Sequence, residues 1–157
     1  MPRLALATLA ALAATALSVA LPVALPAAAT TVLDPPVQAA VVDTDGLAFG
    51  VALAGDLAAV CDHDAGVLLV DLADPFAPVV RGGIDTPGFA RNAAVSGGLA
   101  FVADRAAGLR VLDLADPAQP VEIGAVDTPG LALSVAIAGE HAHVADKGFG
   151  LQVIDVA

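Results

Sequence analysis

Aspartate is the residue type that this sequence repeats most regularly at positions where chemistry could occur. One set with a spacing of 42 residues is Asp43, Asp85 and Asp127, and a second is Asp62, Asp104 and Asp146. Asp45 and Asp64 lie two residues after the first member of each set. Arg91 and Asn92 interrupt an apolar run close to this pattern and could add polar contacts. Gathered on one surface, the carboxylates would suit Ca²⁺ or a basic partner. Each could instead accept hydrogen bonds from the backbone of its own turn, and the repetition favours that local role.

One short segment tests the calcium interpretation. Asp43-Thr44-Asp45-Gly46 resembles the start of a calcium-binding loop, but the remaining ligands are missing. The sister copies carry Pro at the position of Asp45. A weak Ca²⁺ site is therefore the one cofactor that the sequence suggests, and otherwise we expect none.

The three histidines are the other candidates for metal binding or proton transfer. His141 and His143 alternate along one predicted strand, so both rings face one way and could bind a metal. They stand at positions that are apolar in another copy, which favours packed, neutral rings. His63 lies between two aspartates, but no Ser or Cys nucleophile is spaced to partner it, so we expect an exposed turn residue.

Composition excludes several function classes. The sequence contains no Gly-rich phosphate loop, metal-binding Cys pair or nucleophile elbow. The net charge of −11 would repel phosphate backbones, which argues against nucleic acid as a partner. Cys61 is the single cysteine, and because the other copies have Ala at its position we expect a small buried side chain.

A 42-residue repeat must position these residues. Three segments align without a gap, 43–84, 85–126 and 127–157, and about half of the positions are identical between neighbouring copies. Each copy divides into short apolar runs separated by turn-forming residues. The repeats show no helical periodicity with caps.

The middle copy shows the expected elements most clearly. We predict strands over 90–96, 99–103, 109–114 and 121–126, with Gly97-Gly98 as a two-residue hairpin turn. Asp113, like Asp71 and Asp155, should bond the backbone of the turn that follows the third strand. Four antiparallel strands in about 42 residues match a β-propeller blade. The predicted fold is all-β with about three such blades, and its connectivity places the eight aspartates at one end, which we call the acidic rim.

The third strands carry a family resemblance. LRVLDL at 109–114, LQVIDV at 151–156 and GLAFVAD at 98–104 resemble the LVIVD repeat family of exported bacterial and archaeal proteins. The resemblance covers nearly all of the chain after its N-terminal segment, although 67–71 departs from the pattern. It implies a β-propeller-like fold and no assigned biochemistry.

The N-terminal segment resembles a secretory signal. Arg3 precedes an apolar run from Leu4 to Leu21, and Ala27, Ala28 and Ala29 provide small residues for cleavage. We expect 1–29 to be a signal peptide cleaved after Ala29 and 30–36 to be a linker. The mature protein would be extracellular, periplasmic or at the cell surface; a retained N-terminal anchor is the alternative.

The phase of the repeat bears on how the fold closes. Pro36-Val37 aligns with Pro78-Val79 and with Pro120-Val121, so we predict a lone fourth strand over 37–42, the strand that the last copy lacks. This strand could complete the last blade of a second chain, giving a six-bladed ring of two subunits. Alternatively, the chain could be a truncated relative of a longer protein, or its three blades could stay open or close on themselves.

Together these features favour an exported binding or interaction scaffold over an enzyme. Its partner would be a protein or a small molecule bound at the acidic rim, and self-association is a second expectation. The alternatives are a metal-dependent or hydrolase-like propeller enzyme with a site on the rim, and a purely structural envelope protein.

Overall fold

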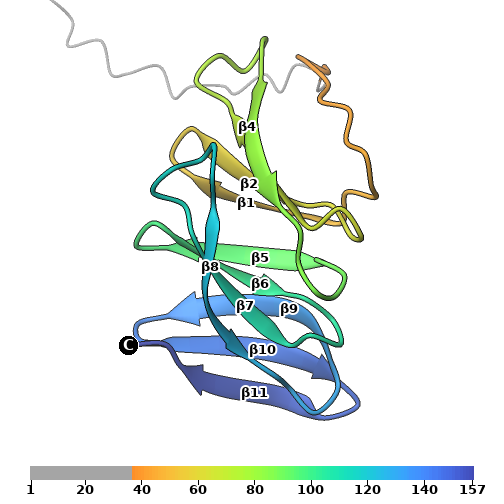
Figure 1. Ribbon diagram of the computed structural model, residues 1–157, viewed down its shortest axis with the longest axis vertical. Helices are drawn as coiled ribbons and strands as arrows, with labels where there is room; N and C mark the ends of the chain where they lie inside the picture. Colours follow the sequence, from red (N-terminus) through yellow and green to blue (C-terminus); the bar gives the residue numbers. More distant parts are fainter. Residues whose placement is uncertain (1–36) are drawn as a thin grey trace, which may run out of the picture. The chain divides into compact units, whose positions relative to one another are not determined.

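The computed structural model describes residues 37–157, in which eleven strands and no helix are formed (Figure 1). The chain divides into two units, Met1–Val37 and Gln38–Ala157, and all of these strands belong to the second. The predicted signal peptide (1–29) and linker (30–36) lie outside the described residues. Between residues 37 and 157, no helix is long and apolar enough to cross a membrane.

The strands form three antiparallel sheets, one for each repeat, in the orders β1-β2-β3-β4, β5-β6-β7-β8 and β11-β10-β9. The first sheet contains β1 (Gly50–Ala54), β2 (Leu57–Cys61), β3 (Val67–Asp71) and β4 (Val79–Ile84). The second contains β5 (Asn92–Ser96), β6 (Leu99–Ala103), β7 (Leu109–Asp113) and β8 (Val121–Val126). The third contains β9 (Leu131–Ala138), β10 (His141–Lys147) and β11 (Gly150–Asp155). This confirms the all-β prediction, with three blade-like sheets that do not close into a ring.

Local sequence accounts for the strand limits. β6 and β8 begin and end as predicted, and β7 ends one residue early, at Asp113. β5 begins at Asn92 instead of residue 90, because Ala90 forms an isolated bridge with His63 of the preceding repeat. Gly97 and Gly98 have φ of 59° and 81°, the left-handed conformation that a tight hairpin turn requires.

The aspartates after the third strands have the role predicted for them. The Oδ1 atoms of Asp71, Asp113 and Asp155 accept hydrogen bonds from the backbone N–H two residues further on, at 2.8, 2.9 and 3.1 Å. Such a bond fixes the start of a turn without help from the rest of the fold. These carboxylates therefore serve the architecture of each repeat.

The hydrophobic core lies between successive sheets. β5 packs beside β1 and β2, and β9 packs beside β5 and β6 (Figure 1). One cluster joins the first two sheets through Ala59, Cys61, Val67, Leu69, Ala93, Ala100, Val102 and Leu112. A second cluster joins the last two through Phe101, Ala103, Leu109, Val135, Ala142 and Val144. Cys61 is fully buried, as its repeat position predicted.

The strand predicted over 37–42 is not formed. Residues 37–49 belong to no strand, although they lead directly into β1. By repeat position this segment corresponds to β4 and β8, which pair with β3 and β7. A strand requires a neighbour for its backbone groups, and within the described residues β11 pairs with β10 alone.

Candidate binding surface at the acidic rim

Three of the eight rim aspartates are buried and therefore do not face a ligand. Asp62 and Asp104 are fully buried, and Asp146 is 3% exposed. The carboxylate of Asp62 accepts hydrogen bonds from Thr44 Oγ1 and from the N–H of Gly46, both at 2.8 Å. It thus ties the turn that opens the first repeat to the end of β2. This structural role spans the repeat, whereas the role that we set beside cation binding was bonding to the backbone of the aspartate's own turn.

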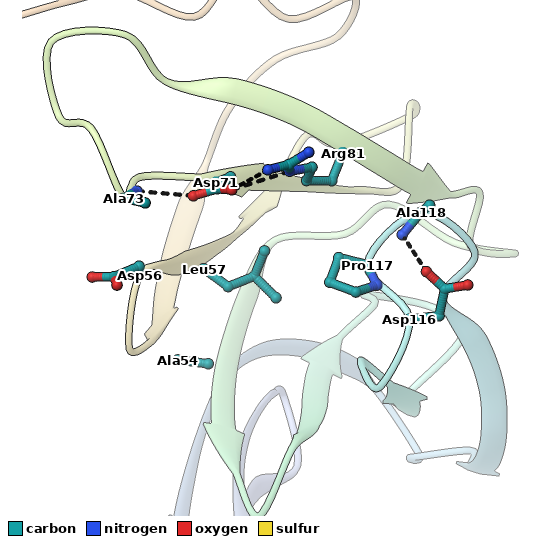
Figure 2. A pocket seen from close by; sticks show the side chains of 9 residues that line it. All are labelled: Ala54, Asp56, Leu57, Asp71, Ala73, Arg81, Asp116, Pro117 and Ala118. Carbon is teal, nitrogen blue, oxygen red and sulfur yellow. Dashed lines mark hydrogen bonds and ion pairs between the residues drawn. The ribbon is translucent and has the colours of Figure 1, made fainter.

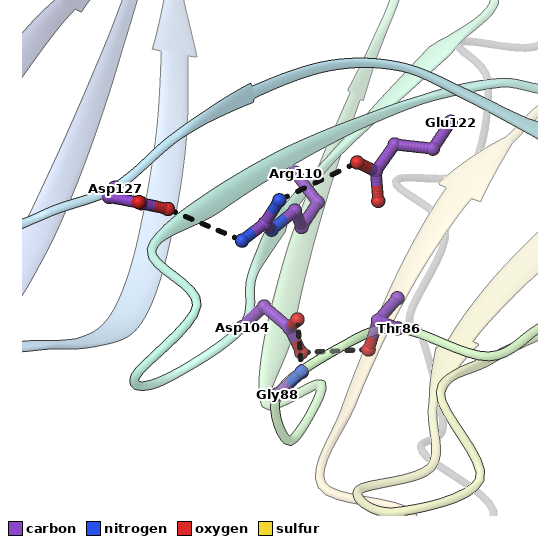
Figure 3. Close-up of polar contacts among 6 residues, drawn as sticks. All are labelled: Thr86, Gly88, Asp104, Arg110, Glu122 and Asp127. Carbon is purple, nitrogen blue, oxygen red and sulfur yellow. Dashed lines mark hydrogen bonds and ion pairs between the residues drawn. The ribbon is translucent and has the colours of Figure 1, made fainter.

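The second repeat reproduces this arrangement around Asp104 (Figure 3). Its carboxylate accepts hydrogen bonds from Thr86 Oγ1 and from the N–H of Gly88, both at 2.8 Å. Burial raises the pKa of Asp104, and the two hydrogen bonds only partly oppose that effect. Nearby, Arg110 pairs with Glu122 at 3.5 Å and with Asp127 at 3.3 Å.

The third repeat departs from the other two. Asp146 accepts one hydrogen bond, from the N–H of Gly130 at 2.9 Å. Its Oδ1 and the Oγ1 of Thr128 are buried without a hydrogen-bond partner in the described residues. Lys147 lies in β10 opposite Leu131, with a register shift beside Asp146.

The other predicted site residues are either exposed to solvent or bonded to neighbouring parts of the fold. Five rim aspartates are exposed: Asp43, Asp45, Asp64, Asp85 and Asp127. Asn92 is half-buried, and its Oδ1 accepts hydrogen bonds from Ser134 Oγ at 3.2 Å and from the N–H of Val135 at 3.1 Å. Asn92 therefore joins β5 to β9, and its carbonyl oxygen is occupied by the fold.

A row of rings and guanidinium groups lies at the same end of the sheets. Arg91 is 4.9 Å from the centre of the Phe49 ring, and Arg105 is 5.6 Å from that of Phe89. Between them, the His63 ring lies 5.2 Å from Phe49 and stacks on Phe89 at 4.4 Å. We call Phe49, His63, Phe89, Arg91 and Arg105 the aromatic row.

The backbone holds this row in place. His63 and Ala90 exchange two hydrogen bonds, at 3.1 and 3.0 Å, across the junction of the first two repeats. Arg105 and Ala132 do the same across the next junction, at 3.1 and 3.0 Å. His63 and Arg105 have φ of 56° and 50°, a conformation that non-glycine residues adopt only where surrounding contacts enforce it.

Sequence reasoning named His63 and Arg91 as binding residues, placed Arg105 at the rim without assigning it a contact, and missed Phe49 and Phe89. Phe49 and Phe89 occupy different positions of the repeat, so no periodicity relates them. They meet at His63 only because the first two sheets pack together. Their one signal in the sequence is scarcity, because the chain has five phenylalanines and no Trp or Tyr.

A cavity lies at the other end of the sheets (Figure 2). It has a volume of about 630 Å³ and is lined by the β1–β2 hairpin, the end of β3 and the turn between β7 and β8. Its one basic residue, Arg81, is paired with Asp71. Asp56 and Asp116 add two more carboxylates to the lining. This acidic, open cavity was also missed, since its residues come from two repeats.

The paired histidines lie on β10 as predicted, but they are not packed in a core. His141 is exposed and His143 is half-buried, because the side of the third sheet that carries them has no sheet against it in residues 37–157. Among the described residues, no group of three His, Cys, Asp or Glu side chains is placed to hold a metal ion.

Comparison with known proteins establishes the family. The LVIVD repeat model matches residues 45–86, 87–128 and 129–157, the same 42-residue period shifted by two residues. No curated protein matches the sequence. Among solved structures, the crystal structure of the computationally designed Ika4 protein is similar with a TM-score of 0.49 and 5% identity, covering 78% of this chain and 99% of that one. With three consecutive matches over more than half of its length, the chain belongs to the LVIVD repeat family.

Proposed function

We propose that this protein is an exported binding scaffold whose ligand-contact surface is the aromatic row. The exposure of the row carries the proposal: Phe49 is 48% exposed and Phe89 is 42% exposed, although both are large apolar side chains. Aromatic side chains and Arg are the residues that contribute most to binding at protein interfaces. The row places both types side by side.

Preorganisation supports the same proposal. The stacked rings restrict one another, and the paired backbone bonds fix His63, which carries the central ring, and Arg105, which carries one outer guanidinium group. Binding to such a surface would cost little ordering of side chains. A positive φ at two non-glycine residues is a strain that folds retain where contacts over-determine it, which is common at binding sites.

The charges indicate the class of ligand. Arg81 and Arg110 form ion pairs with carboxylates, whereas Arg91 and Arg105 contact ring faces. A guanidinium group over a ring can still donate hydrogen bonds from its edge to a carboxylate. The two guanidinium groups therefore suit a ligand that combines a carboxylate with a flat ring, such as an acidic peptide with an aromatic residue or a small aromatic acid. The five exposed aspartates at the same end of the sheets oppose this negative charge, so the affinity must come from direct contact with the row.

A nuclear magnetic resonance titration with benzoate would test this surface. We expect saturable shifts at the backbone amides of Phe49, His63 and Phe89, and loss of these shifts in Phe89→Ala. Phe76→Ala is the matched control, because Phe76 is 75% exposed in the β3–β4 turn at the other end of the sheets. Shifts that do not saturate, or that survive Phe89→Ala, would reject the row and favour a purely structural role.

Export is the second part of the proposal. The charged start, the apolar run and the small residues before Thr30 support removal of residues 1–29. The intact mass of protein recovered from the periplasm or medium of an expressing bacterium should correspond to a chain that begins at Thr30. A cell-associated product that retains Arg3 would contradict cleavage.

A further inference from the structure

The two outer sheets expose apolar faces that the repeat elsewhere buries. On the first sheet, Val51 is 61% exposed, whereas Ala93 and Val135 at the same repeat position are 7% and 6% exposed. Leu53 on the same strand is 62% exposed. We call the side of the first sheet that carries Val51 and Leu53, together with Ala48 just before β1, the leading face.

The third sheet shows the complementary difference on its opposite side. Leu151 is 63% exposed, whereas Val67 and Leu109 at the same repeat position are fully buried. Val153 is 57% exposed, and its counterpart Leu69 is fully buried. We call this side, which also carries His143 and Ala145, the trailing face.

A cavity of about 300 Å³ lies on the leading face. Its lining includes Val51, Ala58, Val60, Val70 and Leu72. The counterparts of these residues in the second repeat all belong to the core between the first two sheets: Ala93, Ala100, Val102, Leu112 and Leu114. The cavity therefore lies where another sheet would pack.

We propose that a second copy of this chain docks head to tail, with its leading face on the trailing face of the first. The template is internal, because the second sheet already presents its leading face to the first sheet, and the third presents its leading face to the second. The occupant is a copy of this chain because both halves of the contact are present on it.

The residues that form hydrogen bonds at the two junctions between repeats have counterparts at the proposed contact. Lys147 has the repeat position of His63 and Arg105, and Ala48 has that of Ala90 and Ala132. The backbones of His63 with Ala90, and of Arg105 with Ala132, exchange two hydrogen bonds at the junctions within the chain. Lys147 differs, because it lies in β10 opposite Leu131, so Lys147 and Ala48 of two copies would repeat this exchange only with a rearrangement at the end of β10. Ser134 has the position of Asn92 and would receive the N–H of Val51, as Asn92 receives that of Val135.

The free edge of β11 gives the second, independent support. The pairing of β7 with β8 sets Leu109 opposite Val126 and Arg110 opposite Ala125. Carried to the next repeat, this register sets Leu151 opposite Val42 and Gln152 opposite Val41 of the docked copy. Residues 37–42, which form no strand alone, would then add a fourth strand to the third sheet by β-augmentation.

The number of sheets sets the stoichiometry. Propellers close with about four to eight blades. Two chains of three sheets make six, whereas one chain makes three and three chains make nine. A head-to-tail contact that closes with two copies satisfies both faces of each chain and leaves no open end for further growth.

Light scattering of the purified protein, measured over a range of concentrations, tests the proposal together with one variant and its control. We expect a mass of two chains that does not grow further. Leu151→Lys should weaken association by roughly 30-fold or more, as expected for a side chain at the centre of an interface. Ile123→Lys should leave the mass unchanged, because Ile123 is 56% exposed on β8 and outside both faces. A monomer at all concentrations, open-ended growth, or equal effects of the two variants would overturn the proposal without affecting the aromatic row.

Discussion

The second sheet and the outer two sheets are built from copies of one repeat in different surroundings. Leu109 in the second sheet is fully buried, whereas Leu151, its counterpart in the third, is 63% exposed. Asp104 accepts two hydrogen bonds, whereas Asp146 accepts one. The difference between Leu109 and Leu151 comes from the neighbour, because a sheet packs against Leu109 and none packs against Leu151 within the described residues. A repeat sheet of this kind folds locally but is completed by the sheet that packs on it.

Thiol labelling should show the largest contrast between the sheets. Burial raises the pKa of Cys61 to about 12, with a further contribution from the charge of Asp104. At pH 8 the thiolate fraction is then on the order of 1,000-fold below that of an exposed thiol. Ala145→Cys in a Cys61→Ala background places a thiol at the same repeat position on the exposed trailing face.

Labelling with an aromatic disulfide reagent at pH 8 would measure both rates. We expect rapid labelling of Ala145→Cys and almost none of Cys61 until the protein unfolds. If the second copy docks as proposed, Ala145→Cys should become protected as the protein concentration rises. Equal rates at the two positions would contradict the described burial.

Truncating the paired leucines should give the next largest contrast. Leu109→Ala removes a fully buried side chain and should lower the free energy of unfolding by about 2–5 kcal/mol. Leu151→Ala should cost much less in dilute protein, where its side chain is exposed. Urea denaturation at low and high protein concentration would separate the two, and a cost for Leu151→Ala that is as large in dilute as in concentrated protein would count against our account.

Removing the buried aspartates should have a smaller effect. Asp104→Ala leaves the hydroxyl of Thr86 and the N–H of Gly88 without their partner and should cost about 1–3 kcal/mol. Asp146→Ala loses only the bond from Gly130 and should cost less. Thermal unfolding of the two variants would test this ranking. A lower melting temperature for Asp146→Ala than for Asp104→Ala would contradict it.

The pH dependence should show the smallest effect, with opposite signs at two aspartates. Because burial raises the pKa of Asp104, its contribution to stability is full below the ordinary value of 3.8 and is lost as pH rises through the folded-state pKa. The pKa of Asp71 is lowered, first by the N–H of Ala73 and then by Arg81. Its contribution is therefore present above 3.8 and is lost as pH falls through the folded-state pKa.

Urea unfolding between pH 3 and 7 would resolve these signs. Asp104→Asn should remove a decline in stability as pH rises above 3.8, and Asp71→Asn should remove a decline at the acid end. The same slope change in both variants would show that the environments of the two carboxylates do not differ as described.

The sequence predicted what each repeat determines locally. β6 and β8 have the expected limits because apolar alternation and turn residues lie within a few positions of each other. The bonds of Asp71, Asp113 and Asp155 were predictable for the same reason. The family followed from the 42-residue period, which the family model reproduces.

What the sequence did not show depends on contacts between repeats. The sequence could not show whether Asp62 and Asp104 are buried or exposed, since the turn residues around them are compatible with both. The aromatic row joins residues 49, 63 and 89, which have no common repeat position. The predicted strand over 37–42 is absent from the single chain because a strand forms only where a neighbouring edge accepts it.

Disulfide trapping across two chains tests the central claim, that a second copy completes the outer sheets, most directly. Val41→Cys and Gln152→Cys, each in a Cys61→Ala background, would be mixed and oxidised with glutathione disulfide, with Ala39→Cys as the shifted-register control. We predict a disulfide-linked heterodimer for Val41→Cys with Gln152→Cys and little for Ala39→Cys. Equal trapping of both mixtures, or none in either, would contradict the account.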